Sequence, residues 1–329
     1  MQKTGIIFKN NFKKEKIKKN KLHNSINKII LELQREIKNK HNLLNILSED
    51  FQFSFRYSQL NNYKKYKTIA IIGMGGSILG TEAIHNFFFD KIKKDIYFFN
   101  DINEKKILNF KKNKNLSKVL FIIVSKSGNT IETLSNTFSL NILKNNAKNI
   151  IIITEKKNNH LFNLAKKFNL FFIEHKSFIG GRFSVLSEVG IIPAYLMGVN
   201  ISKLRSNLYN IFDKLNRKLL ENSSLKISKF LNSKKLNSII FLNYSPELEK
   251  FLFWLQQLIA ESLGKKNKGF LPMISNVPKD HHSLLQLYLD GPKDKIFYIF
   301  SSNGKSDVKI KLHEKNKKKN FLNHKTLKV

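Results

Sequence analysis

The chain contains no cysteine, and this absence removes several kinds of chemistry. Without thiols it can form no disulfide bond, use no thiolate nucleophile and bind no zinc through Cys ligands. Long apolar runs are also missing. None reaches the roughly 18 residues that a membrane-spanning helix needs, so we expect no membrane contact. The lysine-rich residues 1–21 lack the apolar core of a signal peptide, and we expect a cytoplasmic protein with no targeting segment.

Acidic residues and arginine are scarce, whereas lysine is abundant. The 329 residues include 59 Lys and Arg but only 24 Asp and Glu, which gives a formal net charge of +35, and only five of the basic residues are Arg. One interpretation is nucleic-acid binding, because lysine neutralises phosphates. The other is an A/T-rich coding sequence, since Asn, Ile and Phe are abundant too. We favour the second and expect no nucleic-acid partner, because the lysines are scattered and no nucleic-acid-binding signature is present. A positive field would still speed the encounter with an anionic substrate.

Strands and helices alternate after a polar, helical start. Residues 1–64 are predicted to be helical, with one apolar helix face formed by Ile26, Ile29, Ile30, Leu33 and Ile37. The predicted strands are residues 67–73, 118–124, 149–154, 170–174, 238–243 and 295–301. The predicted helices between them are residues 79–88, 130–145, 202–218 and 246–263.

This alternation predicts an α/β protein with parallel sheets, each covered by helices on both faces. The length and the 41% hydrophobic content allow two domains with real cores. We expect a helical segment over 1–64, a first three-layer α/β/α sandwich over 65–200 and a second, incomplete sandwich over 201–329.

A glycine-rich turn follows the first predicted strand. Gly73, Gly75 and Gly76 lie where this strand gives way to a helix, within I-G-M-G-G-S-I-L-G. Such a turn lets the backbone approach a ligand and aims free N–H groups at an anion, although it could equally be a tight turn and no more. A dinucleotide site is disfavoured, because the spacing differs from G-x-G-x-x-G and no acidic residue ends a clear second strand.

A second loop, S-K-S-G-N-T, places three hydroxyls within six residues at a strand-to-helix junction. They belong to Ser125, Ser127 and Thr130. The hydroxyls could cap the following helix, and they could bind an anion at its N-terminus; the two interpretations are compatible. No G-K-[ST] sequence is present, which argues against nucleotide triphosphate binding.

Three further polar positions have ordinary structural explanations. Glu261 could form a surface pair with Lys265, four residues later on a predicted helix. Arg182, in G-G-R-F-S, could form an ion pair between domains, and its fork of donors is one that lysine cannot copy. His281 and His282 could be plain surface residues. No His, Asp and Glu cluster with metal-ligand spacing is present, so we expect no metal.

Five segments in this order nevertheless resemble the glucose-6-phosphate isomerase family. They are I-G-M-G-G-S-I-L-G, S-K-S-G-N-T-I-E-T, G-G-R-F-S-V-L-S, Q-Q-L-I-A-E-S-L-G-K and D-H-H-S-L-L-Q. The resemblance runs from about Ile69 to about Gly291. It implies two sugar isomerase (SIS) domains and no cofactor. It also implies interconversion of glucose 6-phosphate and fructose 6-phosphate through an enediol, a reaction of glycolysis and gluconeogenesis.

The resemblance implies that one group of residues binds the substrate. The phosphate would be held by the S-K-S-G-N-T loop, with the glycine turn beside it. The family pattern places Gln257 at the sugar hydroxyls and Gly181 where the backbone comes close to the ligand. The substrate-binding set is then Gly76, Ser77, Ser125, Lys126, Ser127, Thr130, Gly181 and Gln257.

The resemblance assigns catalysis to three residues. Glu261 would shuttle the proton between C1 and C2, and Arg182 would stabilise the developing oxyanion. His282 matches the family's His-Ser-x-x-x-Gln register and would assist ring opening, while His281 takes the preceding, non-catalytic place. In the family this histidine comes from the neighbouring subunit, which implies a homodimer with shared active sites.

One family feature has no counterpart here. A further catalytic lysine lies in the family on a last helix, in a pattern close to Q-x-x-V-E-x-x-K, and the 38 residues after Gly291 contain no match. We therefore expect a C-terminally truncated chain: a fragment, a decayed isomerase, or an enzyme in which another lysine substitutes. The alternative function is sugar-phosphate binding without turnover. Mannose 6-phosphate is a further candidate substrate. Glucosamine-6-phosphate synthase shares the SIS fold but needs a cysteine that this chain lacks.

Overall fold

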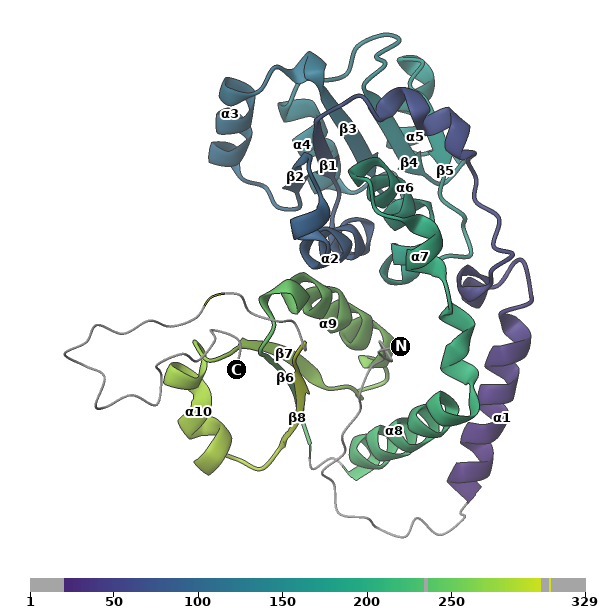
Figure 1. The fold of residues 1–329 in the computed structure, drawn as a ribbon, viewed down its shortest axis with the longest axis vertical. Helices are drawn as coiled ribbons and strands as arrows, with labels where there is room; N and C mark the ends of the chain where they lie inside the picture. Colours follow the sequence, from purple (N-terminus) through teal and green to yellow (C-terminus); the bar gives the residue numbers. More distant parts are fainter. Residues whose placement is uncertain (1–20, 234–235, 303–307, 309–329) are drawn as a thin grey trace, which may run out of the picture.

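The computed structural model describes residues 21–233, 236–302 and 308 (Figure 1). Two parallel sheets organise them, one of five strands in the order β2-β1-β3-β4-β5 and one of three in the order β7-β6-β8. The first sheet contains β1 (Thr68–Ile72), β2 (Asp95–Phe99), β3 (Val119–Val124), β4 (Ile150–Thr154) and β5 (Phe171–Glu174). The second contains β6 (Ser238–Asn243), β7 (Leu271–Asn276) and β8 (Lys295–Phe300). The prediction of parallel α/β architecture is confirmed.

The first sheet is buried on both faces, as its unbroken apolar strands require. Successive side chains of a strand point to opposite faces, so Ile69 and Ile71 enter one core while Ala70 and Ile72 enter the other. The first core is shared with α6 (Glu188–Met197) and α2 (Leu79–Phe87), and the second with α3 (Glu104–Asn113) and α5 (His160–Lys167). These layers place the carboxyl ends of β1 and β3, and the loops that follow them, at one edge of the sheet.

The second sheet is covered unequally. Its one face packs on α9 (Glu249–Leu263) through Ile239, Phe241 and Leu252. The other face meets α10 (His281–Asp290), where the Tyr288 and Phe297 rings lie 5.2 Å apart. Apolar side chains on that second face and on α10 stay exposed, among them Leu271, Leu289 and Ile299.

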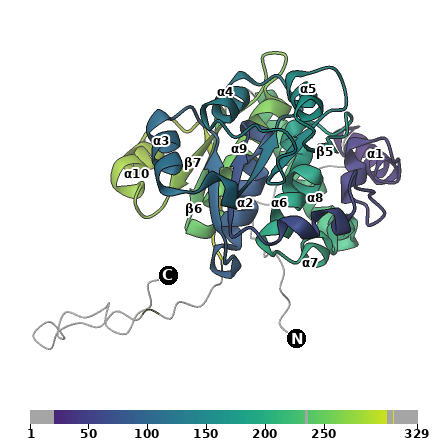
Figure 2. The ribbon, with the colours of Figure 1, turned by 90° about the horizontal axis from the view of Figure 1, so that it is seen from above.

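Helix α9 also joins the second sheet to the first unit, because it packs against α2. The N-terminal α1 (Lys21–Glu36) lies along α8 (Lys214–Ser233), with Ile26 and Ile30 buried against Leu225. Of the other residues on the predicted apolar face, Ile37 is also buried but lies just past the end of α1, whereas Ile29 is half exposed. In both ribbon views α1 and α10 lie on opposite sides of the molecule (Figures 1 and 2).

Several predicted elements need correction. The predictions omitted β2, α3, α5, β7 and α10, and the helix expected over 130–145 is the shorter α4 (Ile131–Ser139). The helix expected over 202–218 is broken into α7 (Ile201–Arg205), a 3-10 turn and α8, since Asn207 adopts a left-handed φ of 62°. Strand β2 is the second strand that the sequence did not reveal, and Asp101 lies two residues beyond its end. The lack of an acidic residue there is thus no longer an argument against a dinucleotide site. The other argument, the glycine spacing, still holds.

Two of the omissions have physical reasons. Strand β2 is a sheet edge with an exposed first residue, so its apolar signal is short. Strand β7 contains Pro272, which disfavours a central strand but is tolerated at an edge such as β7 occupies. Among the helices described, none is long and apolar enough to cross a membrane.

Candidate active site

The glycine turn after β1 and the G-G-R-F-S segment pack directly on each other. A Cβ atom on Gly76 would lie 2.3 Å from the carbonyl carbon of Gly181 and 2.6 Å from the backbone nitrogen of Arg182. The Ser184 hydroxyl donates to the Gly76 and Gly181 carbonyls, at 3.1 and 2.7 Å. Gly76 must therefore be glycine for a packing reason, and the contact limits how closely the Arg182 backbone can approach this turn.

Arg182 reaches from this contact to helix α9. Its Nη1 lies 3.2 Å from Glu261 Oε2 in an ion pair, and its Nε donates to the Ser262 hydroxyl at 2.9 Å. The indole of Trp254 donates to the Arg182 carbonyl at 2.8 Å. Three residues of one helix thus hold both ends of the arginine. Ser262 and Trp254 were missed as site residues, although Ser262 stands within the E-S-L-G-K motif.

Gln257 completes the group around Glu261. Its Nε2 donates to Glu261 Oε1 at 2.6 Å, so both oxygens of the carboxylate accept a hydrogen bond, one from Gln257 and one from Arg182. The side chain of Glu261 is 47% exposed, which leaves it accessible to a ligand. Gln257 also sits over the glycine turn: a Cβ on Gly75 would lie 3.0 Å from its Nε2, and Gly75 has a φ of +52°. Glu261 is four residues before Lys265, but the described ion pair of Glu261 is with Arg182.

The hydroxyl loop lies at the carboxyl end of β3. The Ser125 hydroxyl is 2.8 Å from that of Thr130 and 3.4 Å from that of Ser127, and it accepts from the Gly128 N–H at 3.1 Å. Thr130 takes the N-cap position of α4, yet it makes no side-chain capping bond to that helix. The hydroxyls therefore face one another at a helix N-terminus rather than capping it, an arrangement that suits an anion.

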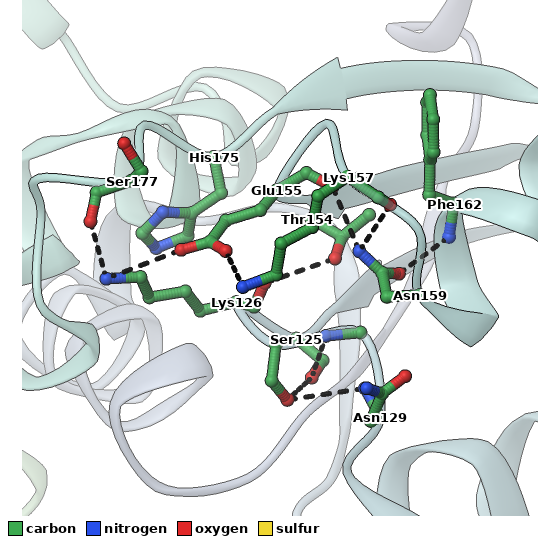
Figure 3. A network of polar contacts seen from close by, with 12 residues as sticks. Ser125, Lys126, Asn129, Thr154, Glu155, Lys157, Asn159, Phe162, His175 and Ser177 are labelled. Atoms are coloured by element: carbon green, nitrogen blue, oxygen red, sulfur yellow. Dashed lines mark hydrogen bonds and ion pairs between the residues drawn. The ribbon is translucent and has the colours of Figure 1, made fainter.

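Lys126 belongs to the same loop, but its ammonium group points away from Ser125, toward Ser177 and Glu155 (Figure 3). It donates to the Ser177 carbonyl at 2.8 Å and lies 3.6 Å from Glu155 Oε1. Glu155 is 8% exposed and pairs with Lys157 as well. Burial, with the nearby Lys126 charge adding to it, lowers the pKa of His175 beside them to about 4, so its ring is neutral at neutral pH.

His282 lies apart from this group. It is an exposed residue in the first turn of α10, which packs on the face of the second sheet opposite α9. No interaction described in the structure joins it to Arg182 or Glu261. Its role in ring opening, and the partner subunit that this role requires, stay predictions. Ser77 ends the 3-10 turn at Gly75–Ser77, beside Gly76.

The arrangement can bind an anion and move a proton. The two loops follow neighbouring strands of one parallel sheet, and the carboxylate and guanidinium meet above the glycine turn. Ligands of open α/β sheets bind outside the carboxyl ends of the strands. Within residues 21–233, 236–302 and 308, no group of three His, Cys, Asp or Glu side chains could hold a metal ion.

Comparisons with known proteins place this site in context. The phosphoglucose isomerase family profile matches residues 32–273. The chain is 36% identical over 272 residues to the glucose-6-phosphate isomerase of Methanocaldococcus jannaschii, covering 80% of this chain and 67% of that protein. It is 34% identical to the probable glucose-6-phosphate isomerase of Methanococcus maripaludis, covering 88% and 68%. The chain thus spans about two thirds of the length of these curated relatives.

Solved structures agree on the fold. A hypothetical protein from Thermus thermophilus superimposes with a TM-score of 0.74 at 24% identity, over 93% of this chain and 78% of that one. A glucose-6-phosphate isomerase from Chlamydia trachomatis superimposes with a TM-score of 0.52 at 20% identity, over 81% and 54%.

Proposed function

The chain belongs to the phosphoglucose isomerase family, and from this premise we propose that it interconverts glucose 6-phosphate and fructose 6-phosphate. The observation that carries the proposal is the meeting of Arg182, Glu261 and Gln257 over the glycine turn, next to a loop of three hydroxyls. An aldose–ketose isomerase needs these parts: an anion site for the phosphate, one carboxylate base, and a cation near the reacting carbons.

The phosphate is assigned to the hydroxyl loop. Ser125, Ser127 and Thr130 offer donors that can turn toward the ligand, and the N-terminus of α4 adds backbone N–H groups and a favourable dipole. Gly76 and Ser77 belong to the turn after β1, the strand that pairs with β3. The sugar carbons then extend toward α9, where Gln257 can reach hydroxyl groups.

Glu261 is assigned the proton transfer. It takes the proton from C2 of the open-chain aldose and returns it to C1, with an enediol in between. The negative charge that develops on the oxygen between these steps needs a fixed donor, and Arg182 can supply it because its Nη1 lies 3.2 Å from Glu261 Oε2. Because Arg182 pairs with Glu261 in the free protein, we expect the sugar to take over part of the guanidinium when it binds.

Ring opening is assigned to His282 of a second copy of the chain. The support is the family register of His282, together with its exposed position at the start of α10. In this arrangement the protein is a homodimer, and each site needs a residue from the other subunit. A chain with intact Arg182 and Glu261 but without dimer contacts would then act on the open-chain sugar alone.

The test is isotope exchange. The purified full chain is incubated with fructose 6-phosphate in D2O and followed by NMR. Glucose 6-phosphate with deuterium at C2 is the expected product, because the proton removed by Glu261 exchanges with solvent. A folded chain that binds the sugar phosphate but gives neither product nor deuterium uptake would contradict the proposal and favour a binding protein without turnover.

A further inference from the structure

Lys126 connects the hydroxyl loop to the segment that carries Arg182. The hydroxyls of the loop gather around Ser125, where the phosphate is assigned. The Lys126 ammonium instead donates to the Ser177 carbonyl at 2.8 Å (Figure 3). Ser177 is five residues before Arg182 in the chain. A single side chain therefore bridges two loops that lie 51 residues apart in the sequence.

Glu155 holds this bridge in place. Its carboxylate is almost fully buried and lies 3.6 Å from the Lys126 ammonium. The backbone of Lys126 is fixed by the same neighbours, since its carbonyl accepts from the Glu155 N–H at 3.2 Å and from the Thr154 hydroxyl at 3.3 Å. His175 stays neutral beside them and does not compete for the carboxylate. Lys126 is thus anchored at its backbone and at its charged end.

The path from Ser177 to Arg182 is short and internally bonded. The Ile179 N–H donates to the Lys176 carbonyl, and the Phe183 N–H donates to the Gly180 carbonyl. At its far end the Arg182 carbonyl accepts from the Trp254 indole. A shift of the hydroxyl loop would pass through Lys126 and this turn to the guanidinium.

We propose that Lys126 and Glu155 are positioning residues that couple phosphate binding in the hydroxyl loop to the placement of Arg182. The proposal rests on the proposed function only in taking the hydroxyl loop as the phosphate site. It gives Lys126 a task other than direct contact with the phosphate. The bound phosphate fixes the loop, the loop fixes Lys126, and Lys126 fixes the backbone that presents Arg182 to the sugar.

The chain carries its own reporter for this coupling. Trp254 is its single tryptophan, and its indole N–H bonds to the Arg182 carbonyl. Inorganic phosphate is titrated into the full chain while Trp254 fluorescence is recorded, and phosphate affinity is measured separately by calorimetry. We expect phosphate to change the emission of the unaltered protein. In Glu155→Gln and in Lys126→Met most of the emission change should be lost, while phosphate still binds, because the loop that holds the phosphate is no longer tied to the backbone of Arg182.

Two matched variants separate coupling from general effects. Lys157→Met removes the second lysine that pairs with Glu155. Because Lys157 is more than half exposed and does not bridge to Ser177, the emission change should persist. Lys126→Arg can still donate to the Ser177 carbonyl and should restore most of the response. A merely structural role of Lys126 would predict neither the split between binding and emission nor this rescue.

Three outcomes would overturn the proposal. Loss of phosphate binding in Lys126→Met, with an unchanged emission response in Glu155→Gln, would make Lys126 a direct phosphate ligand. An unchanged response in Lys126→Met would show that Arg182 does not depend on the bridge, and a lost response in Lys157→Met would reduce the effect to local charge. None of these readouts requires turnover. A chain without activity would therefore refute the proposed isomerase function but leave the coupling between phosphate binding and Arg182 testable.

Discussion

At the scale of single residues, the choice of arginine at position 182 is informative in a chain that otherwise uses lysine. Arg182 makes two directed contacts with one helix, through Nε to Ser262 and through Nη1 to Glu261. The fixed angle between guanidinium N–H groups allows both at once, whereas a lysine ammonium would be a single point of charge. The site thus depends on donor geometry as well as on positive charge, which the whole chain has in excess.

Replacing Glu261 by Gln should slow catalysis strongly and spare phosphate binding. The amide keeps the shape of the carboxylate but cannot accept the C2 proton, so turnover should fall by about 10²-fold to 10⁴-fold. Steady-state rates and phosphate calorimetry measure the two effects. Glu104→Gln, an exposed carboxylate in the first turn of α3, is the matched control and should be neutral in both. Unchanged turnover in Glu261→Gln would refute the assignment of the base.

His175 should make the protein less stable in mild acid. Burial lowers its pKa from 6.5 to about 4. Between pH 6.5 and pH 4, His175 is therefore protonated in the unfolded chain but neutral in the folded protein. The stabilisation is complete above pH 6.5 and is lost as the pH falls toward 4, by roughly 3 kcal/mol. Urea unfolding at about pH 7 and about pH 4.5 should show a smaller loss in His175→Asn than in the unaltered protein. Glu82 and Glu188, whose pKa values burial raises, act in the opposite sense in both proteins and cancel in the comparison. Equal losses in the two proteins would argue against a buried neutral histidine.

The sequence was sufficient to single out Arg182, Glu261 and Gln257, but not their supports. The motifs mark residues by type and spacing, and the i, i+4 spacing places Gln257 next to Glu261. Trp254, Ser262 and Glu155 contribute through contacts with segments far away in the chain. No periodicity encodes such a contact, since it depends on how two elements dock. The same limit applies to Lys126, whose loop was predicted while the direction of its side chain was not.

At the scale of elements, the site depends on how closely two turns approach each other. The 3-10 turn at Gly75–Ser77 meets the one at Gly181–Leu186 with no room for a methyl group at Gly76. Parallel strands followed by glycine turns could be predicted from the sequence, because apolar runs and glycines are local signals. The edge strands β2 and β7 could not be predicted as easily, because exposure and Pro272 weaken those signals.

Gly76→Ala and Gly181→Ala form a matched pair that tests this contact. The first methyl group would collide with the backbone of Gly181 and Arg182, whereas the second would meet nothing within 4 Å. We expect Gly76→Ala to lower the free energy of unfolding by about 1–3 kcal/mol and to reduce activity as Arg182 shifts. Gly181→Ala should leave the melting temperature nearly unchanged. Equal melting temperatures for the two variants would contradict the close approach.

At the scale of the whole molecule, the net charge of +35 should influence substrate capture rather than chemistry. A positive field attracts a sugar phosphate dianion over distances that salt shortens, with a Debye length of about 10 Å at 0.1 M. Between about 20 mM and 500 mM KCl we expect kcat/KM for fructose 6-phosphate to fall several-fold while kcat stays constant. A kcat/KM that does not respond to salt would mean that the field has no part in the encounter. A kcat that falls in parallel would point instead to a salt effect on the folded site.

Catalysis also depends on the seam between α2 and α9, the contact through which the two units of the chain dock. Arg182 belongs to the chain around the first sheet and Glu261 to the helix on the second, so the two meet only while both units are docked. A perturbation that loosens the seam would part them while each sheet keeps its hydrogen bonds. Enzymatic rate should therefore vanish at a lower urea concentration than far-ultraviolet ellipticity. A small separation of the two units would therefore inactivate the protein in the cell while both sheets remain folded.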